Sequence, residues 1–245
     1  MPWSHCFLLQ SITVKTMIVV PTYNEGENLP RLIEQLEGLG PGLDALVVDD
    51  NSPDGTGRLA EELAVSRPWI HVMHRPGKQG LGTAYVEGFR YALDKGYDVI
   101  GEMDADLSHN PVFLPTMLRA LANADLVLGS RYVPGGGVSN WGVMRKAISW
   151  GGSSYARIIL GIGVRDLTGG FKLFRREVLE KLSLDTVRSN GYSFQIELTY
   201  RAVRRGYRVV EVPIIFEDRR VGKSKLSRQV VLEAMLMVPR LRLEG

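Results

Sequence analysis

The fold is decided by residues 98–106, which read Asp-Val-Ile-Gly-Glu-Met-Asp-Ala-Asp. An apolar run ends here in two carboxylates, Asp104 and Asp106. Strand side chains alternate between faces, so both carboxylates point the same way. Two close like charges are unfavourable unless a cation lies between them, and carboxylate oxygens suit Mg²⁺ or Mn²⁺ together with phosphate. The stretch therefore predicts a strand that ends in a metal-held diphosphate, although an isolated Asp-x-Asp is as typical of a solvated turn.

On both sides of this stretch, short β-branched runs alternate with amphipathic patterns. The predicted strands are residues 17–21, 45–49, 70–74, 98–103 and 125–129. The predicted helices are residues 27–37, 56–65, 82–93 and 112–122. This alternation is typical of an α/β fold with parallel strands and right-handed crossovers. Ligands of open α/β sheets bind beyond the carboxyl ends of the strands, where three polar clusters fall, at residues 23–25, 49–52 and 104–106.

The second half of the chain reads as additions to the same domain. Residues 133–142 contain three consecutive glycines and predict a mobile loop. Helices are expected at 144–160 and 193–205, and strands at 167–175 and 208–216. We expect an N-terminal extension (1–16), one main domain (17–228), and a C-terminal amphipathic helix and tail (229–245).

Composition narrows the class of protein. The chain has 245 residues, 44% of them hydrophobic, with a net charge of +3, which is typical of a globular protein. Basic residues gather from Arg131 onward, which favours an anionic partner. Nucleic acid is disfavoured as that partner, because no basic run is interleaved with aromatic residues. Cys6 is the only cysteine, so no internal disulfide forms, in agreement with a cytosolic setting. The sequence contains no uninterrupted run of about 18 apolar residues, so we expect no membrane-spanning helix.

Two strand-end clusters have the chemistry of a nucleoside site. Tyr23 could stack on a base and Glu25 could accept its hydrogen bonds, although the same residues suit an ordinary strand-to-helix turn. Asp50 could bind base or ribose groups, while Ser52 or Asp54 could cap the next helix.

Two further groups carry less information. Residues 77–84 are glycine-rich but lack the order of a phosphate-binding P-loop, so we expect only a close approach of backbone to ligand. His71, His74 and His109 show no spacing with metal-binding partners and are interpreted as structural.

Seven motifs together make a resemblance specific. They are Pro-Thr-Tyr-Asn-Glu (21–25), Asp-Asp-Asn-Ser-Pro-Asp-Gly-Thr (49–56), Gly-Leu-Gly-Thr-Ala-Tyr (80–85), Asp-Ala-Asp-Leu-Ser-His (104–109), Gly-Ser-Arg-Tyr (129–132), Asp-Leu-Thr-Gly-Gly-Phe (166–171) and Gly-Lys-Ser-Lys-Leu (222–226). In this order they resemble the dolichol-phosphate mannosyltransferases, or polyprenol monophosphomannose synthases, within the family-2 inverting glycosyltransferases. The resemblance spans about residues 17–228.

The resemblance implies a single GT-A-like, Rossmann-related domain with a mostly parallel sheet and C-terminal interfacial helices. It implies metal-dependent transfer of mannose from GDP-mannose to a polyprenyl (dolichyl-type) monophosphate, with inversion at the anomeric carbon. The acceptor phosphate is already an anion, so no general base is needed, in contrast to inverting glycosidases. Cationic groups that bring two anions together are needed instead.

The resemblance also assigns residues. The guanosine site would be lined by Pro21, Tyr23, Glu25, Val48 and Asp50. Asp104 and Asp106 would hold Mg²⁺ or Mn²⁺, with Ala105 beside the nucleotide. Ser108 stands where some relatives carry a metal-ligating Gln, so it would be a weak third ligand. The sugar-phosphate and acceptor phosphate would meet Arg131, Arg219 and Lys225, with Arg145 as a further cation; of these site residues, Asp106, Arg131, Arg219 and Lys225 are the catalytic candidates.

A lipid acceptor implies a membrane surface. Residues 223–242 combine an apolar run with basic flanks, which fits an interfacial helix as well as an ordinary core helix. The helix at 144–160 could add to an acceptor groove. We expect a peripheral protein at the cytoplasmic face of the membrane, and the resemblance adds a possible membrane-anchoring subunit.

Three alternatives compete with this interpretation. The nearest is a family-2 enzyme that moves glucose or a related sugar from a UDP donor to undecaprenyl phosphate. A sugar nucleotidyltransferase would open with a Gly-rich, Arg-containing loop, where this chain has residues 21–25. A non-catalytic scaffold would be expected to lack the carboxylate pair or the distal basic residues.

Overall fold

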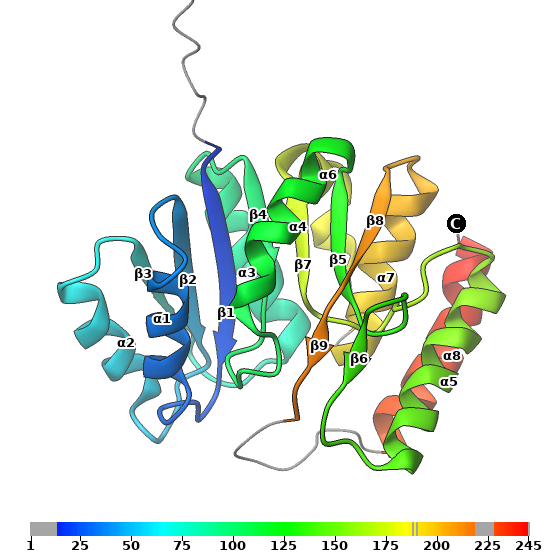
Figure 1. Ribbon diagram of the computed structural model, residues 1–245, viewed down its shortest axis with the longest axis horizontal. Coiled ribbons are helices and arrows are strands. Elements are labelled where there is room, and N and C mark those ends of the chain that lie inside the picture. Colours follow the sequence, from blue (N-terminus) through cyan, green and yellow to red (C-terminus); the bar gives the residue numbers. More distant parts are fainter. Residues whose placement is uncertain (1–13, 188, 190, 219–227, 245) are drawn as a thin grey trace, which may run out of the picture.

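A seven-stranded sheet forms the centre of the molecule (Figure 1). The computed structural model describes residues 14–187, 189, 191–218 and 228–244. The strand order is β3-β2-β1-β4-β7-β5-β8. The strands are β1 (Thr16–Thr22), β2 (Leu43–Asp49), β3 (Ile70–His74), β4 (Val99–Glu102), β5 (Leu126–Ser130), β7 (Lys172–Arg175) and β8 (Val209–Pro213). The five strands predicted in the first half are confirmed within two residues at each end.

Strand β1 shows why the sheet is buried on both faces. Met17 and Val19 pack into one hydrophobic cluster, whereas Ile18 and Val20 pack into a second cluster on the opposite face. A parallel strand covered by helices on both sides is expected to be apolar at every position in this way. The sheet is therefore the middle layer of three.

Helices form the two outer layers. The face of Met17 and Val19 is covered by α3 and α7, and the opposite face by α1 and α4. The helices are α1 (Leu29–Glu37), α2 (Thr56–Val65), α3 (Leu81–Asp94), α4 (Leu114–Ala120), α5 (Val143–Leu160), α6 (Arg176–Lys181), α7 (Gly191–Arg204) and α8 (Arg228–Glu244), with short 3-10 turns at Pro111–Phe113, Leu121–Asn123 and Leu184–Thr186. The sequence did not predict α6, which is only six residues long.

The second half differs from the expectation in three places. Strand β7 is shorter than the predicted 167–175 and runs antiparallel to β4 and β5. The predicted strand 208–216 is interrupted after Pro213, because a second short strand, β9 (Ile215–Phe216), leaves the main sheet. The predicted loop 133–142 contains β6 (Gly137–Val138), which pairs in parallel with β9. Proline cannot donate to a ladder, which suits the break before β9.

Helices α5 and α8 form a pair at one side of the molecule (Figure 1). The Tyr155 hydroxyl donates to the Met235 carbonyl at 2.9 Å, and Ala156, Leu160, Val238 and Leu241 join the core. The helix expected at 223–242 is observed from Arg228, and residues 223–227 lie outside the described residues. None of the helices in the described part of the chain has the length and apolar content of a membrane-spanning helix.

Candidate active site

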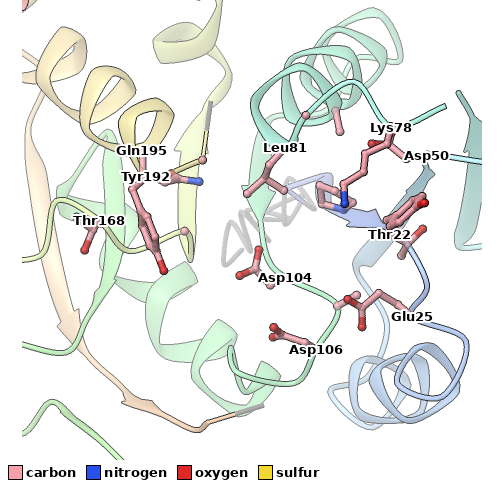
Figure 2. A pocket seen from close by; sticks show the side chains of 17 residues that line it. Thr22, Glu25, Asp50, Lys78, Leu81, Asp104, Asp106, Thr168, Tyr192 and Gln195 are labelled. Atoms are coloured by element: carbon pink, nitrogen blue, oxygen red, sulfur yellow. The ribbon is translucent and has the colours of Figure 1, made fainter. Parts of the chain in front are cut away.

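A cleft of about 270 Å³ opens at the carboxyl ends of β1, β2 and β4. Figure 2 shows Thr22, Asp50 and Lys78 on one wall, Thr168, Tyr192 and Gln195 on the other, and Asp104 and Asp106 between them. The lining residues are Pro21, Thr22, Tyr23, Glu25, Asp50, Lys78, Gly80, Leu81, Ala84, Asp104, Ala105, Asp106, Thr168, Gly170, Gly191, Tyr192 and Gln195. The predicted meeting of three strand ends is thus confirmed.

Asp49 holds the first two strand ends together. Its carboxylate accepts from the Thr22 hydroxyl at 3.0 Å and from the Ser52 hydroxyl and backbone amide at 2.6 and 3.0 Å. The Ser52 hydroxyl also accepts from the Asn24 amide. Asn24 and Asn51 have φ values of 60° and 56°, a conformation that asparagine tolerates better than most residues. This network leaves the neighbouring Asp50 to face the cleft.

Asp50 is held by a residue that the sequence interpretation missed. The Arg75 guanidinium donates from Nη1 to Asp50 Oδ1 at 2.5 Å, and both side chains are nearly buried. Burial raises the pKa of Asp50, and the charge and hydrogen bond of Arg75 oppose that rise. Arg75 directly follows β3 and belongs to no motif quoted above, so no spacing pointed to it.

The carboxylate pair follows β4 on a tightly fixed turn. Tyr85 donates its hydroxyl hydrogen to Asp104 Oδ1 at 3.2 Å, and burial together with Asp104 raises the pKa of Tyr85 well above its ordinary value. His109 Nδ1 accepts from the Asp104 amide at 3.1 Å. Burial lowers the pKa of His109, which favours the neutral ring that this acceptor role requires. The Ser108 amide donates to Asp106 Oδ1 at 3.1 Å.

The donor set on this turn fits a hard divalent cation. Two carboxylates line the cleft one residue apart, and Mg²⁺ or Mn²⁺ commonly takes one or two carboxylates plus phosphate oxygens and water. No group of three or more His, Cys, Asp or Glu residues suited to a metal occurs among the described residues. A third ligand would therefore have to come from elsewhere, such as a diphosphate. His109 Nδ1 already accepts from the Asp104 amide, which agrees with its interpretation as structural.

The wall opposite the strand ends comes from the segment before β7 and from α7. Gly170 lies close to this helix, because an added Cβ would meet Gln195 Nε2 at 3.2 Å. Beneath this wall, Lys172 and Glu102 face each other across β7 and β4 and form a fully buried ion pair at 2.9 Å. Lys172 also donates to the backbone and side-chain oxygens of Gln195. Tyr192 and Gln195 were not predicted, since α7 reads in the sequence as an ordinary amphipathic helix.

Burial raises the pKa of Glu102 to about 6, while the charge of Lys172 opposes that rise. An ion pair of this kind is rarely a net source of stability, because both groups lose their hydration. Its position, which ties α7 to the sheet below the cleft, indicates that it fixes the wall that Gln195 belongs to.

Several predicted residues lie away from the cleft. Val48 is fully buried in the core, and the Ser108 hydroxyl is buried without a hydrogen-bond partner among the described atoms. Neither residue lines the cleft, so a role of Ser108 as a metal ligand stays a prediction. Arg219 and Lys225 lie outside the described residues.

Arg131 and Arg145 are both engaged with aspartates. Arg131 is only 6% exposed and binds Asp166 with two side-chain hydrogen bonds of 2.6 and 2.7 Å. Its Nη2 also donates to the hydroxyl of Thr168, which lines the cleft. Arg145 donates to Asp218 at 2.6 Å and lies over the Trp141 ring. The phosphate-binding roles expected of these two arginines stay predictions.

Known proteins are similar to this chain over most of its length. Residues 17–183 match the model of glycosyl transferase family 2. The chain is similar to an undecaprenyl-phosphate mannosyltransferase of Micrococcus luteus, with 50% identity over 93% of both chains. It is also similar to a polyprenol monophosphomannose synthase of Mycolicibacterium smegmatis, with 51% identity over 95% of this chain and 89% of the relative.

Solved structures share the fold at lower identity. A glucosyl-3-phosphoglycerate synthase of Mycobacterium tuberculosis, in complex with Mn²⁺, UDP and glucosyl-3-phosphoglycerate, matches with a TM-score of 0.68 and 19% identity, over 93% of this chain and 79% of that one. A mannosyltransferase of Pyrobaculum calidifontis, in complex with GDP-Man and Mn²⁺, matches with a TM-score of 0.57 and 17% identity. The match covers 94% of this chain and 73% of that one. These matches support the predicted GT-A-like architecture.

Proposed function

The chain belongs to glycosyl transferase family 2, and we propose that it transfers mannose from GDP-mannose to a polyprenyl monophosphate with a divalent metal. The observation that carries the proposal is the similarity, near 50% identity over almost the whole chain, to an undecaprenyl-phosphate mannosyltransferase and a polyprenol monophosphomannose synthase. The cleft supports the proposal, because its carboxylate pair lies between two walls. One wall carries residues suited to a nucleoside, and the other is formed in part by α7.

The proposed donor lies across the strand ends. The guanosine would lie on the wall of Tyr23, Glu25 and Asp50, and the diphosphate would reach Asp104 and Asp106. A bound Mg²⁺ or Mn²⁺ would neutralise the charge that grows on the leaving diphosphate. Tyr85 orients the Asp104 carboxylate, and the Ser108 amide orients that of Asp106. The mannose would then lie toward Tyr192 and Gln195 on the opposite wall.

The acceptor needs no base on the protein. A phosphate monoester is an anion near neutral pH and can attack the anomeric carbon directly, which inverts the configuration. The protein has to hold two anionic substrates side by side, a task suited to Arg and Lys side chains. We assign this task to Arg219 and Lys225. Arg131 would contribute through Thr168, which lines the cleft and whose hydroxyl accepts a hydrogen bond from Arg131.

The lipid tail of the acceptor would meet the pair α5 and α8. Exposed apolar side chains gather there, and a globular surface rarely carries so many without a partner. They are Val143, Met144, Ile148, Trp150, Ile158 and Ile159 on α5, and Met235, Leu236 and Leu243 on α8. We propose that this face rests on the cytoplasmic surface of the membrane. A membrane-anchoring protein subunit stays a prediction.

The donor is tested by comparison of two nucleotide sugars in separate reactions. The purified protein would be supplied with a short polyprenyl phosphate, Mg²⁺ or Mn²⁺, and either GDP-mannose or UDP-glucose, and lipid-linked sugar would be extracted and counted. We expect product from GDP-mannose. Product from UDP-glucose alone would favour the alternative enzyme that glucosylates undecaprenyl phosphate and would overturn the proposed donor.

A further inference from the structure

Arg75 lies behind the nucleoside wall and does not line the cleft. We propose that it is a positioning residue that makes the cleft select guanine over uracil by fixing the carboxylate of Asp50. The inference rests on the proposed function, because it assumes that the nucleoside of the donor lies against Asp50.

The guanidinium of Arg75 joins three separate elements. Its Nη1 donates to Asp50 Oδ1 after β2, and its Nη2 donates to the Thr83 hydroxyl of α3 at 2.7 Å and to Gln79 Oε1 at 3.3 Å. Its Nε lies 3.2 Å from Glu87 Oε2, and its backbone amide donates to the Asp49 carbonyl at 2.8 Å. The side chain is 1% exposed, so these contacts leave it little freedom.

This arrangement requires arginine in particular. The planar guanidinium presents its donors in a fixed fork, whereas a lysine ammonium is a single point charge on a flexible stem. A lysine could neutralise Asp50 but could not also reach Thr83 and Gln79 in the same geometry. The charge would be kept, and the orientation of the Asp50 carboxylate would be lost.

The orientation of Asp50 matters because the two bases differ in their edges. Guanine presents adjacent N1–H and N2–H donors, whereas uracil presents one N3–H donor between two carbonyl oxygens. An ionised carboxylate only accepts hydrogen bonds and has about four lone-pair sites, so Asp50 can accept from Arg75 and from a base together. A fixed carboxylate gains two hydrogen bonds from guanine, while it gains one from uracil and faces a repelling oxygen.

The test measures binding of GDP and UDP by titration calorimetry in the presence of Mn²⁺, with wild type, Arg75→Lys and Thr83→Val. Arg75→Lys should lower the preference for GDP over UDP by about tenfold or more, the discrimination that a bidentate base contact provides. Thr83→Val removes the hydrogen bond that Arg75 donates to Thr83, together with the one from the Thr83 hydroxyl to the Gly80 carbonyl. It leaves the charge of Arg75 in place, so it should shift the same ratio in the same direction by less. The Michaelis constant for GDP-mannose should rise more than kcat falls.

Arg67→Lys is the matched control, because Arg67 pairs with Glu37 at the surface at 3.2 Å, and it should keep the wild-type ratio. Melting temperatures separate a structural effect from the proposed one. The inference is overturned if Arg75→Lys keeps the GDP preference of wild type, or if it weakens both nucleotides equally. If Arg75→Lys does not fold, an unchanged ratio in Thr83→Val overturns it. A wild-type protein that prefers UDP would instead refute the proposed donor.

Discussion

Single side chains set the shape of the candidate metal site, and Tyr85 is the clearest case. Its ring stacks against the rings of Phe89 and Phe194, and its hydroxyl donates to Asp104 Oδ1. Groups that orient a metal ligand commonly change affinity by about 10–100-fold when removed. Asp104 would otherwise turn in a cleft that leaves its side chain 30% exposed.

Tyr85→Phe is therefore expected to weaken binding of Mn²⁺ by about tenfold while the protein stays folded. The measurement is Mn²⁺ binding by electron paramagnetic resonance, with no substrate present. Tyr207→Phe is the control, because the Tyr207 hydroxyl donates to a backbone carbonyl far from the cleft. Equal Mn²⁺ affinity in Tyr85→Phe and wild type would contradict this role.

Arg131 combines a structural role with its expected functional one. Asp166 is fully buried and accepts three hydrogen bonds from Arg131, one of them from the backbone amide. Removal of one partner of a buried ion pair costs about 3–5 kcal/mol, because a charge is left without compensation. Arg131→Leu should lower the free energy of unfolding by that amount, measured by urea denaturation. A variant as stable as wild type but inactive would show instead that Arg131 acts on the substrate alone.

At the scale of elements, Asp54 fastens the start of α2 to the turn after β1. It accepts from the Gly26 amide at 3.1 Å and from the Thr56 amide and hydroxyl at 3.0 and 2.6 Å. Burial alone would raise the pKa of Asp54, but the hydrogen bonds from Thr56 and Gly26 outweigh it and hold that pKa below its ordinary value. A carboxyl group with a lowered pKa stabilises the fold above its unfolded pKa, and this stabilisation is lost as the pH falls through the folded pKa.

Asp54→Asn should therefore lower the free energy of unfolding by about 1 kcal/mol at pH 7, the order of magnitude of one hydrogen bond. The difference from wild type should begin to shrink once the pH falls below the ordinary pKa of an aspartate, and it should be lost below the folded pKa of Asp54. Urea unfolding at pH 7 and at pH 3 measures both. Glu62→Gln, in an exposed i,i+4 pair with Arg58, is the control. A difference that is the same at both pH values would contradict the electrostatic explanation.

The helices α5 and α8 make the second element-scale prediction. Ile158 and Leu236 are 71% and 77% exposed, and insertion of one such side chain into lipid contributes about 1.5–3 kcal/mol. Ile158→Glu and Leu236→Glu should each weaken binding to vesicles with anionic lipid by about tenfold or more. Vesicle co-sedimentation measures this. Val65→Glu alters an apolar residue on α2 that is at least as exposed, and this variant should bind vesicles as wild type does. Equal binding by all variants would exclude this face.

For the whole molecule, the sequence predicted best where local pattern and burial agree. The apolar run before Asp104 fixed β4, and the polar strand ends correctly marked one edge of the sheet. It predicted less well where structure depends on contacts distant in sequence. The antiparallel direction of β7 follows from its pairing with β4 and β5, and the β6–β9 pair joins segments more than 70 residues apart.

The candidate site shows the same division. Tyr23, Glu25, Asp50, Asp104, Ala105 and Asp106 were expected in the cleft and are found there. Arg75 and Gln195 were not expected, because their importance comes from partners on other elements, Asp50 and Lys172. The resemblance assigned Arg131 to the phosphates of the substrates, while its burial against Asp166 could be seen only in three dimensions.

The central claim is metal-dependent mannosyl transfer through the carboxylate pair. Its most direct measurement is the yield of lipid-linked mannose from GDP-mannose and a short polyprenyl phosphate, for wild type with and without EDTA and for Asp106→Ala with Mn²⁺. We predict product only for wild type with metal, and a loss of at least about 100-fold in the other two, as expected when a main electrostatic contribution to the transition state is removed. Undiminished transfer in EDTA or by Asp106→Ala would contradict the account.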